Sequence, residues 1–189
     1  WMDWGLRKVK LDKVRKYATG QGVTVAVLDT GADLDHPQLI GHLTAGYDFV
    51  DGDRFPDDEP NNVDDDEDGL IDEGTGHGTH IANLIAVIAP AAAIMPVRVL
   101  NSDGGGTLFD IVNGLVYAVD HGAQIINMSF SAVDDSPFLS AAVNYAINRK
   151  VLLIAAAAGA DGYLSKDISA KDLKERFSCV LESFISLEK

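Results

Sequence analysis

The sequence predicts an α/β fold in which helices cover both faces of a mostly parallel sheet, giving three αβα layers. Short β-branched runs alternate with longer segments whose apolar residues repeat at helical spacing, which is typical of successive right-handed βαβ units. The chain has 189 residues, of which 47% are apolar and 23% charged, and this suits one α/β domain with a sizeable core.

The first part of the chain predicts two strands and a long loop. A β-branched run after a glycine turn at 22–29 favours a buried parallel strand, and 45–50 is a weaker strand candidate. The stretch 51–76 contains Pro56, Pro60 and several glycines, so we expect a loop. Loops of this length are usually functional or ordered by a metal ion.

Capping and breaking residues set the bounds of the later elements. Pro90 closes the first helix, Thr107 and Asp110 form a capping box that opens the second, and Gly122 ends it. Ser136, followed by proline, opens the third. The expected elements are helix 77–89, strand 94–100, helix 107–122, strand 124–130, helix 136–150 and strand 151–158.

Composition argues against several classes of partner. A net charge of −14 argues against a basic face for nucleic acid or anionic membranes. No apolar run reaches the roughly 18 residues needed to span a bilayer. The single Cys179 excludes an internal disulfide framework. No signal-peptide pattern opens the chain, which starts at Trp1, so its compartment stays open.

Asp29, Thr30 and Gly31 end the first predicted strand. Alone, this tripeptide is weak evidence of function, because an Asp can simply cap a turn. Aspartic proteases carry it too, but their fold is all-β and needs two carboxylates that share a proton. The βαβ pattern downstream contradicts that alternative. In parallel α/β sheets, chemistry lies beyond the carboxyl ends of the strands, where both Asp29 and the segment 129–131 are expected.

The segment 76–80, Gly-His-Gly-Thr-His, opens a predicted helix. His77 and His80 share a helix face, so a metal pair or a surface cap is one alternative. No glutamate follows in the arrangement that zinc proteases use. Glycine on both sides of His77 favours close approach of backbone or substrate instead.

Together, the two segments resemble the subtilisin-like serine protease (subtilase) family, which places these motifs in the same order and about as far apart. Further matches fall in family order over about residues 4–162, at 5–6, 19–23, 89–100, 117–122, 125–129 and 153–159. The resemblance implies a subtilisin-like fold and peptide-bond hydrolysis of peptide or protein substrates. Family members are usually secreted.

The resemblance assigns roles to matching residues. Asp29 would hold the imidazole of His77 in the right tautomer, and His77 would act as general base and then general acid. The substrate backbone would pair as an added strand with one rim of a cleft, and a second rim would face it. The first rim would be Gly104, Gly105 and Gly106, and the second Ser129, Phe130 and Ser131, where the family usually has glycine at the last position.

Two departures from the family pattern predict an inactive chain. Ala160 stands where the family has its oxyanion asparagine, a loss that costs roughly 10²–10³ in kcat in subtilisin itself. No serine follows Gly-Thr, and losing the nucleophile costs about 10⁶ in subtilisin. We therefore expect a truncated catalytic domain over 1–160 and an unrelated strand–helix tail over 161–189 packed on it.

The tail supports two hypotheses. Residues 159–173 resemble the end of a response-regulator receiver domain, in which a lysine at the position of Lys166 contacts the phosphoryl group. The alternative is a helix, capped by Ser169 and Asp172, that covers an exposed sheet edge. A fusion or frameshift near residues 158–161 would explain either.

The acidic loop is a candidate calcium site. Between Asp51 and Glu73 the chain carries twelve acidic residues against one arginine. Asp64, Asp66, Asp68 and Asp72 could supply oxygen ligands in the manner of an EF-hand loop, although Thr75 stands where that loop has its bidentate glutamate. The alternative is a solvated acidic loop.

Three functions therefore stay open. The first is a subtilase-type peptidase domain without turnover, the second a calcium-ordered peptide-binding module and the third a receiver-like signalling domain. We expect no organic cofactor, and the oligomeric state stays open.

Overall fold

The computed structural model of the chain describes residue 7 and residues 10–130 and 136–155. Its centre is a five-stranded sheet in which every strand pair is parallel, in the order β2-β3-β1-β4-β5. The strands are β1 (Thr24–Asp29), β2 (Tyr47–Asp48), β3 (Ala93–Arg98), β4 (Ile125–Met128) and β5 (Leu152–Ala155).

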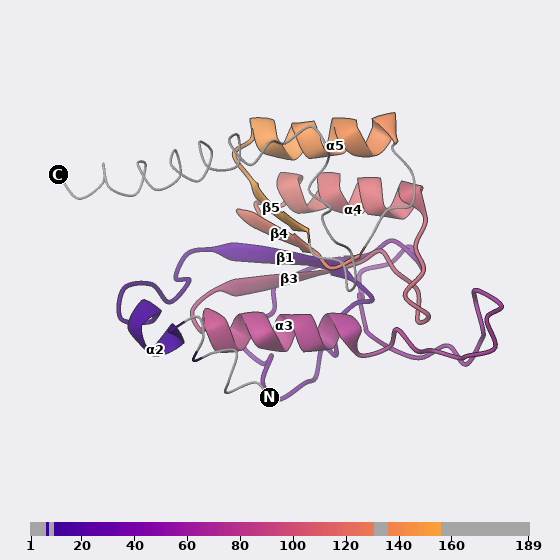
Figure 1. The fold of residues 1–189 in the computed structure, drawn as a ribbon, viewed down its shortest axis with the longest axis horizontal. Helices are drawn as coiled ribbons and strands as arrows, with labels where there is room; N and C mark the ends of the chain where they lie inside the picture. Colours follow the sequence, from indigo (N-terminus) through magenta and orange to yellow (C-terminus); the bar gives the residue numbers. More distant parts are fainter. Residues whose placement is uncertain (1–6, 8–9, 131–135, 156–189) are drawn as a thin grey trace.

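Helices cover both faces of the sheet, which confirms the predicted three layers. Helix α3 lies on one face, and α4 and α5 lie side by side on the other (Figure 1). The short α2 precedes β1. The helices are α2 (Leu11–Val14), α3 (His77–Ile88), α4 (Leu108–Asp120) and α5 (Pro137–Asn148).

The central strand β1 is buried on both sides because it faces a helix layer on each. Ala26 and Leu28 are fully buried in the cluster that includes the inner faces of α4 and α5. Val27, which points the other way, packs with Ala82 and Ala86 of α3. This two-sided burial explains why residues 25–28 of the strand are all apolar, rather than apolar at alternate positions.

The short strand β2 lies at the sheet edge, where an ion pair accompanies its backbone pairing with β3. Asp48 and Arg98 are register partners across β2 and β3. Their side chains form a buried ion pair at 2.8 Å, and Asp51 adds a second carboxylate at 2.6 Å from the same guanidinium nitrogen. The predicted strand at 45–50 therefore exists, but pairs over two residues only.

Most predicted elements are present with bounds shifted by one or two residues. Thr107 caps α4 as expected, accepting a hydrogen bond from the amide of Asp110 at 3.1 Å, and Ser136 caps α5. The end of the strand predicted at 151–158 and the tail 161–189, with Lys166 and the helix from Ser169, lie outside the described residues. Among the described helices, none is both long and apolar enough to cross a bilayer.

Helix α4 approaches the sheet at Gly114. A Cβ atom at this position would lie 2.5 Å from Cγ1 of Val99 and 3.2 Å from Cγ1 of Val97. Both distances are shorter than ordinary packing contacts, so the glycine sets the spacing between α4 and β3.

Gly114→Ala should lower the free energy of unfolding. Alanine gains up to about 1 kcal/mol in helix propensity, but overpacking against the two valines costs about 1–3 kcal/mol. Urea denaturation would measure the difference, with the exposed Ser140→Ala of α5 as a control expected to change stability little. An increase in stability would contradict the packing argument.

Candidate active site

The structure brings Asp29 and His77 together at the carboxyl edge of the sheet. Asp29 is the last residue of β1, and His77 is the first residue of α3. Nδ1 of His77 lies 2.7 Å from Oδ1 of Asp29. Two residues separated by 48 positions in sequence are thus joined by one short hydrogen bond.

Two glycines beside His77 serve different purposes. A Cβ atom at Gly78 would lie 2.1 Å from the carbonyl oxygen of Gly31 and 3.1 Å from Cβ of Asp29, so the backbone of α3 touches the turn after β1. The expected close approach is therefore a backbone contact at this residue. Gly76 has open space around it but a φ of 88°, so glycine there serves the left-handed conformation of the helix N-cap.

The carboxylate of Asp29 is fully buried. Its Oδ1 accepts the amide hydrogen of Thr30 at 2.8 Å as well as the His77 contact, while Oδ2 has no hydrogen-bond partner within the described part of the chain. Burial raises the pKa of Asp29, an effect that the hydrogen bonds from His77 and Thr30 oppose. The acid is thus held in a site that disfavours its own charge.

The imidazole of His77 is open on its other side. Its side chain is 45% exposed, and Nε2 makes no hydrogen bond to any described residue. When Nδ1 donates to the Asp29 carboxylate, Nε2 must be the unprotonated nitrogen of the neutral ring. The arrangement therefore presents a proton acceptor, Nε2, to solvent, while the hydrogen bond from Nδ1 to Asp29 fixes the tautomer of the ring.

Both predicted rims lie at the same edge of the sheet as this pair. Gly104, Gly105 and Gly106 follow β3 and are exposed, whereas Ser129 and Phe130 follow β4 and are half-buried. Because β1 lies between β3 and β4, these segments flank Asp29 on opposite sides. Ser131 lies outside the described residues, as does Ala160.

The glycines of the first rim also have local reasons to be glycine. Gly104 has a φ of 82°, and a Cβ atom at Gly106 would lie 2.6 Å from the carbonyl oxygen of Val99. Gly105 donates its amide to the side chain of Asn101 at 2.8 Å. Turn geometry thus accounts for two of these glycines without a substrate, and their pairing with a peptide stays a prediction.

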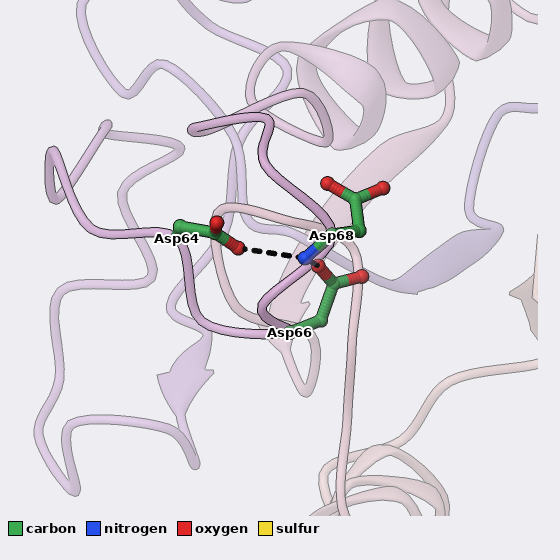
Figure 2. A group of neighbouring side chains, drawn as sticks. All are labelled: Asp64, Asp66 and Asp68. Carbon is green, nitrogen blue, oxygen red and sulfur yellow. Dashed lines mark hydrogen bonds between the residues drawn. The ribbon is translucent and has the colours of Figure 1, made fainter.

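Three of the four predicted metal ligands come together. Oxygen atoms of Asp64, Asp66 and Asp68 lie within 4.8 Å of one another, at alternate positions of the loop (Figure 2). Backbone amides hold them: Asp68 donates to Asp64 at 3.1 Å and to Asp66 at 3.2 Å. Asp72 does not join this group, because its carboxylate accepts amide hydrogens from residues 61 and 62.

The acidic loop is mostly exposed, but hydrogen bonds attach it to the segment beside the first rim. The buried carboxylate of Asp103, next to the first rim, accepts hydrogen bonds from the amides of Asp65 and Asp72. Gly74 donates to the carbonyl of Ser102 at 2.8 Å and accepts from the amide of His77 at 3.1 Å. The loop therefore connects the first rim to the start of α3.

No sequence pattern indicated a role for Asp58, Asp103 or Thr79 at this edge. Asp58 accepts hydrogen bonds from the amides of Gly76, the N-cap of α3, and Thr79 in its first turn. Gly76 is eighteen positions farther along the chain, and no local sequence pattern links it to Asp58. The pairing of Pro56 with the turn after β1, through the amide of Ala32 at 2.9 Å, brings Asp58 there. Only the fold exposes that relationship.

Comparison with known proteins identifies relatives of this chain. The family model of the Subtilase family matches residues 20–175. Thermitase from Thermoactinomyces vulgaris is 35% identical over 167 residues, which are 83% of this chain and 54% of thermitase. The chain therefore spans about half the length of this relative.

Solved structures agree on the fold. A lanthipeptide protease superposes with a TM-score of 0.61 at 30% identity, covering 76% of this chain and 41% of that one. A cold-adapted subtilisin-like serine proteinase gives a TM-score of 0.59 at 30% identity, covering 74% and 47%. The predicted subtilisin-like αβα fold is confirmed. The receiver-like tail hypothesis concerns residues outside the described part and stays a prediction.

Asp29→Asn should raise the melting temperature at pH 7. The folded state raises the pKa of Asp29 by burying it, so the ionised form destabilises the fold above that pKa. Burying a charged carboxylate costs several kcal/mol, more than the roughly 1–3 kcal/mol for an unpaired amide. Each kcal/mol recovered should add about 2–4 °C to the Tm of a domain of this size.

The gain should shrink as the pH falls through the raised pKa and vanish below about 3.9, the ordinary value for an unfolded aspartate. Calorimetric melting between pH 3 and pH 8 would measure it. The exposed Asp12→Asn should show no comparable pH-dependent gain. A lower Tm for Asp29→Asn at neutral pH would contradict the burial argument.

Proposed function

The chain belongs to the subtilase family, and from that membership we propose that it supplies the acid–base pair of a serine endopeptidase acting on peptides or proteins. One observation carries the proposal. The buried Asp29 holds Nδ1 of His77 at 2.7 Å while the rest of the imidazole stays open to solvent. A general base needs both conditions, a fixed tautomer and an accessible second nitrogen.

In this proposal Nε2 of His77 removes the proton from a serine hydroxyl as that oxygen attacks the scissile carbonyl. The resulting imidazolium carries a positive charge beside the Asp29 carboxylate, which is buried and therefore interacts with it more strongly than it would in water. The same proton then passes from Nε2 to the leaving amine when the peptide bond breaks. Asp29 accepts no proton in either step.

Within the 189 residues no serine stands in the Gly-Thr-Ser context of the family nucleophile. The described residues would therefore bind the substrate and transfer protons, and by themselves they would not form an acyl-enzyme. A hydroxyl delivered to Nε2 would be required for turnover. The exposed segment Gly104–Gly106 would pair with the substrate backbone as an added strand, opposite Ser129 and Phe130.

A second proposal concerns calcium. Asp64, Asp66 and Asp68 offer hard carboxylate oxygens at alternate positions, followed by Gly69 with a φ of 92°, which fits a calcium loop. Calcium would neutralise part of the repulsion among the loop's acidic side chains. Because the loop is fastened to Asp103 and to His77 through Gly74, ordering it would also order the first rim and the start of α3.

The 189-residue chain should bind an extended peptide without hydrolysing it. Loss of the nucleophile removes about 10⁶ in kcat from a complete triad, so casein and generic peptide substrates should give background rates only. Fluorescence anisotropy would follow peptide binding, and mass spectrometry would follow cleavage. Hydrolysis that a serine-directed phosphonofluoridate blocks, and that His77→Ala abolishes, would contradict the expectation of no turnover.

Calcium should bind the EDTA-treated chain and raise its melting temperature. At a calcium concentration of 100 times Kd, binding to the folded state alone adds about 2.7 kcal/mol. Titration calorimetry and thermal melting would measure both effects. Asp66→Asn should weaken binding, whereas Asp72→Asn, outside the three-residue group, should retain it. Absence of both binding heat and a Tm shift would end the calcium proposal.

A further inference from the structure

We propose that Asp58 is a positioning residue that holds the end of β1 and the start of α3 together, and so maintains the Asp29–His77 hydrogen bond. This inference rests on the proposed function, because it concerns the same acid–base pair. The Asp58 carboxylate forms hydrogen bonds with Thr30, Gly76 and Thr79 and none with the imidazole or the Asp29 carboxylate, so it would act through the backbones of the pair.

The Asp58 carboxylate accepts four hydrogen bonds. Its Oδ1 accepts from the amide of Gly76 at 2.9 Å and from the hydroxyl of Thr30 at 3.0 Å. Its Oδ2 accepts from the amide of Thr79 at 2.9 Å and from the hydroxyl of the same residue at 2.6 Å. One half-buried carboxylate therefore holds donors from two segments, the turn after β1 and the first turn of α3.

Both threonine hydroxyls extend this network. The hydroxyl of Thr30 accepts the amide hydrogen of Gly78 at 3.0 Å, and the hydroxyl of Thr79 accepts that of Asp33 at 2.9 Å. Each hydroxyl thus donates to Asp58 and accepts from the opposite segment. The two segments are cross-linked in both directions, with Asp58 as the shared acceptor.

Helix α3 lacks the usual means of capping its own N-terminus. Its N-cap is Gly76, which has no side chain to accept a hydrogen bond, and its first turn contains no acidic residue. The first amides of a helix need acceptors, and its positive end favours a negative charge. Asp58 meets both needs from outside the helix, through charge-assisted hydrogen bonds that are stronger than neutral ones.

These anchors stand next to the acid–base pair in sequence. His77 lies between Gly76 and Gly78, whose amides bond to Asp58 and Thr30, and Asp29 directly precedes Thr30. A shift of the first turn of α3 would lengthen the 2.7 Å contact, and hydrogen bonds weaken steeply as their geometry degrades. The charge of Asp58 itself opposes ionisation of Asp29, so its benefit must come from geometry.

The test follows the low-field NMR resonance of the His77 Nδ1 proton in the 189-residue chain. This signal reports the hydrogen bond to Asp29, whereas a general loss of stability would leave it in place while the chain stays folded. Measurements are made below the melting temperature of each variant, with backbone amide spectra of β1 as a check of the fold. The resonance is assigned as the low-field signal that changes in Asp29→Asn.

In Asp58→Ala the resonance should disappear or exchange with water roughly tenfold faster, the change expected on losing charged hydrogen bonds. Glu59→Gln, an exposed acid next in sequence, should leave the resonance unchanged. Thr79→Val should weaken it, and Thr79→Ser, which keeps the hydroxyl, should restore it. Where Asp58→Ala does not fold, Thr79→Val and Thr30→Val decide by the same signal.

Two negative results would have different meanings, one for the positioning role of Asp58 and one for the proposed function. An unchanged resonance in folded Asp58→Ala, or in both threonine variants, overturns the positioning role and leaves the acid–base pair intact. A resonance missing from the unsubstituted chain, with a spectrum that Asp29→Asn does not alter, instead counts against the proposed function itself.

Discussion

The geometry of the site depends on how closely the first turn of α3 approaches the end of β1. Contact at that point is backbone against backbone: a Cβ atom at Gly78 would lie 2.1 Å from the carbonyl of Gly31. Any side chain there would push α3 away from the sheet, and the imidazole of His77 would move with it. Burial of Ala82 and Ala86 against Val27 then sets the helix along the sheet, so core packing and site geometry share one constraint.

The close contact between α3 and the end of β1 also explains the electrostatics of Asp29 and His77. Enclosing Asp29 removes its carboxylate from water, which costs stability but makes its attraction for a positive imidazole stronger than in solvent. The histidine stays half open, because only its Nδ1 side contacts the buried acid at the end of β1. A buried acid behind an exposed base is thus a consequence of where one helix begins relative to one strand.

The acidic loop carries most of the molecule's net negative charge, and it also connects the parts of the site. Near its start Asp58 holds the first turn of α3, and farther along the amides of Asp65 and Asp72 bond to Asp103 beside the first rim. Between these anchors the loop presents Asp64, Asp66 and Asp68 as a group. A segment that composition alone would leave as solvated surface is therefore attached by hydrogen bonds at several points to the carboxyl edge of the sheet.

Local pattern was enough to predict the αβα layers, the apolar central strand and the placement of Asp29 and His77 at strand and helix ends, because periodicity and capping are short-range properties. Strand lengths were harder to predict: β2 pairs with β3 over two residues only, and the Asp48–Arg98 ion pair beside this pairing is a long-range contact that no local pattern indicates. The roles of Asp58, Thr79 and Asp103, and the exclusion of Asp72 from the acidic group, were decided by tertiary structure alone. Each depends on hydrogen bonds between segments that only the folded chain brings within reach.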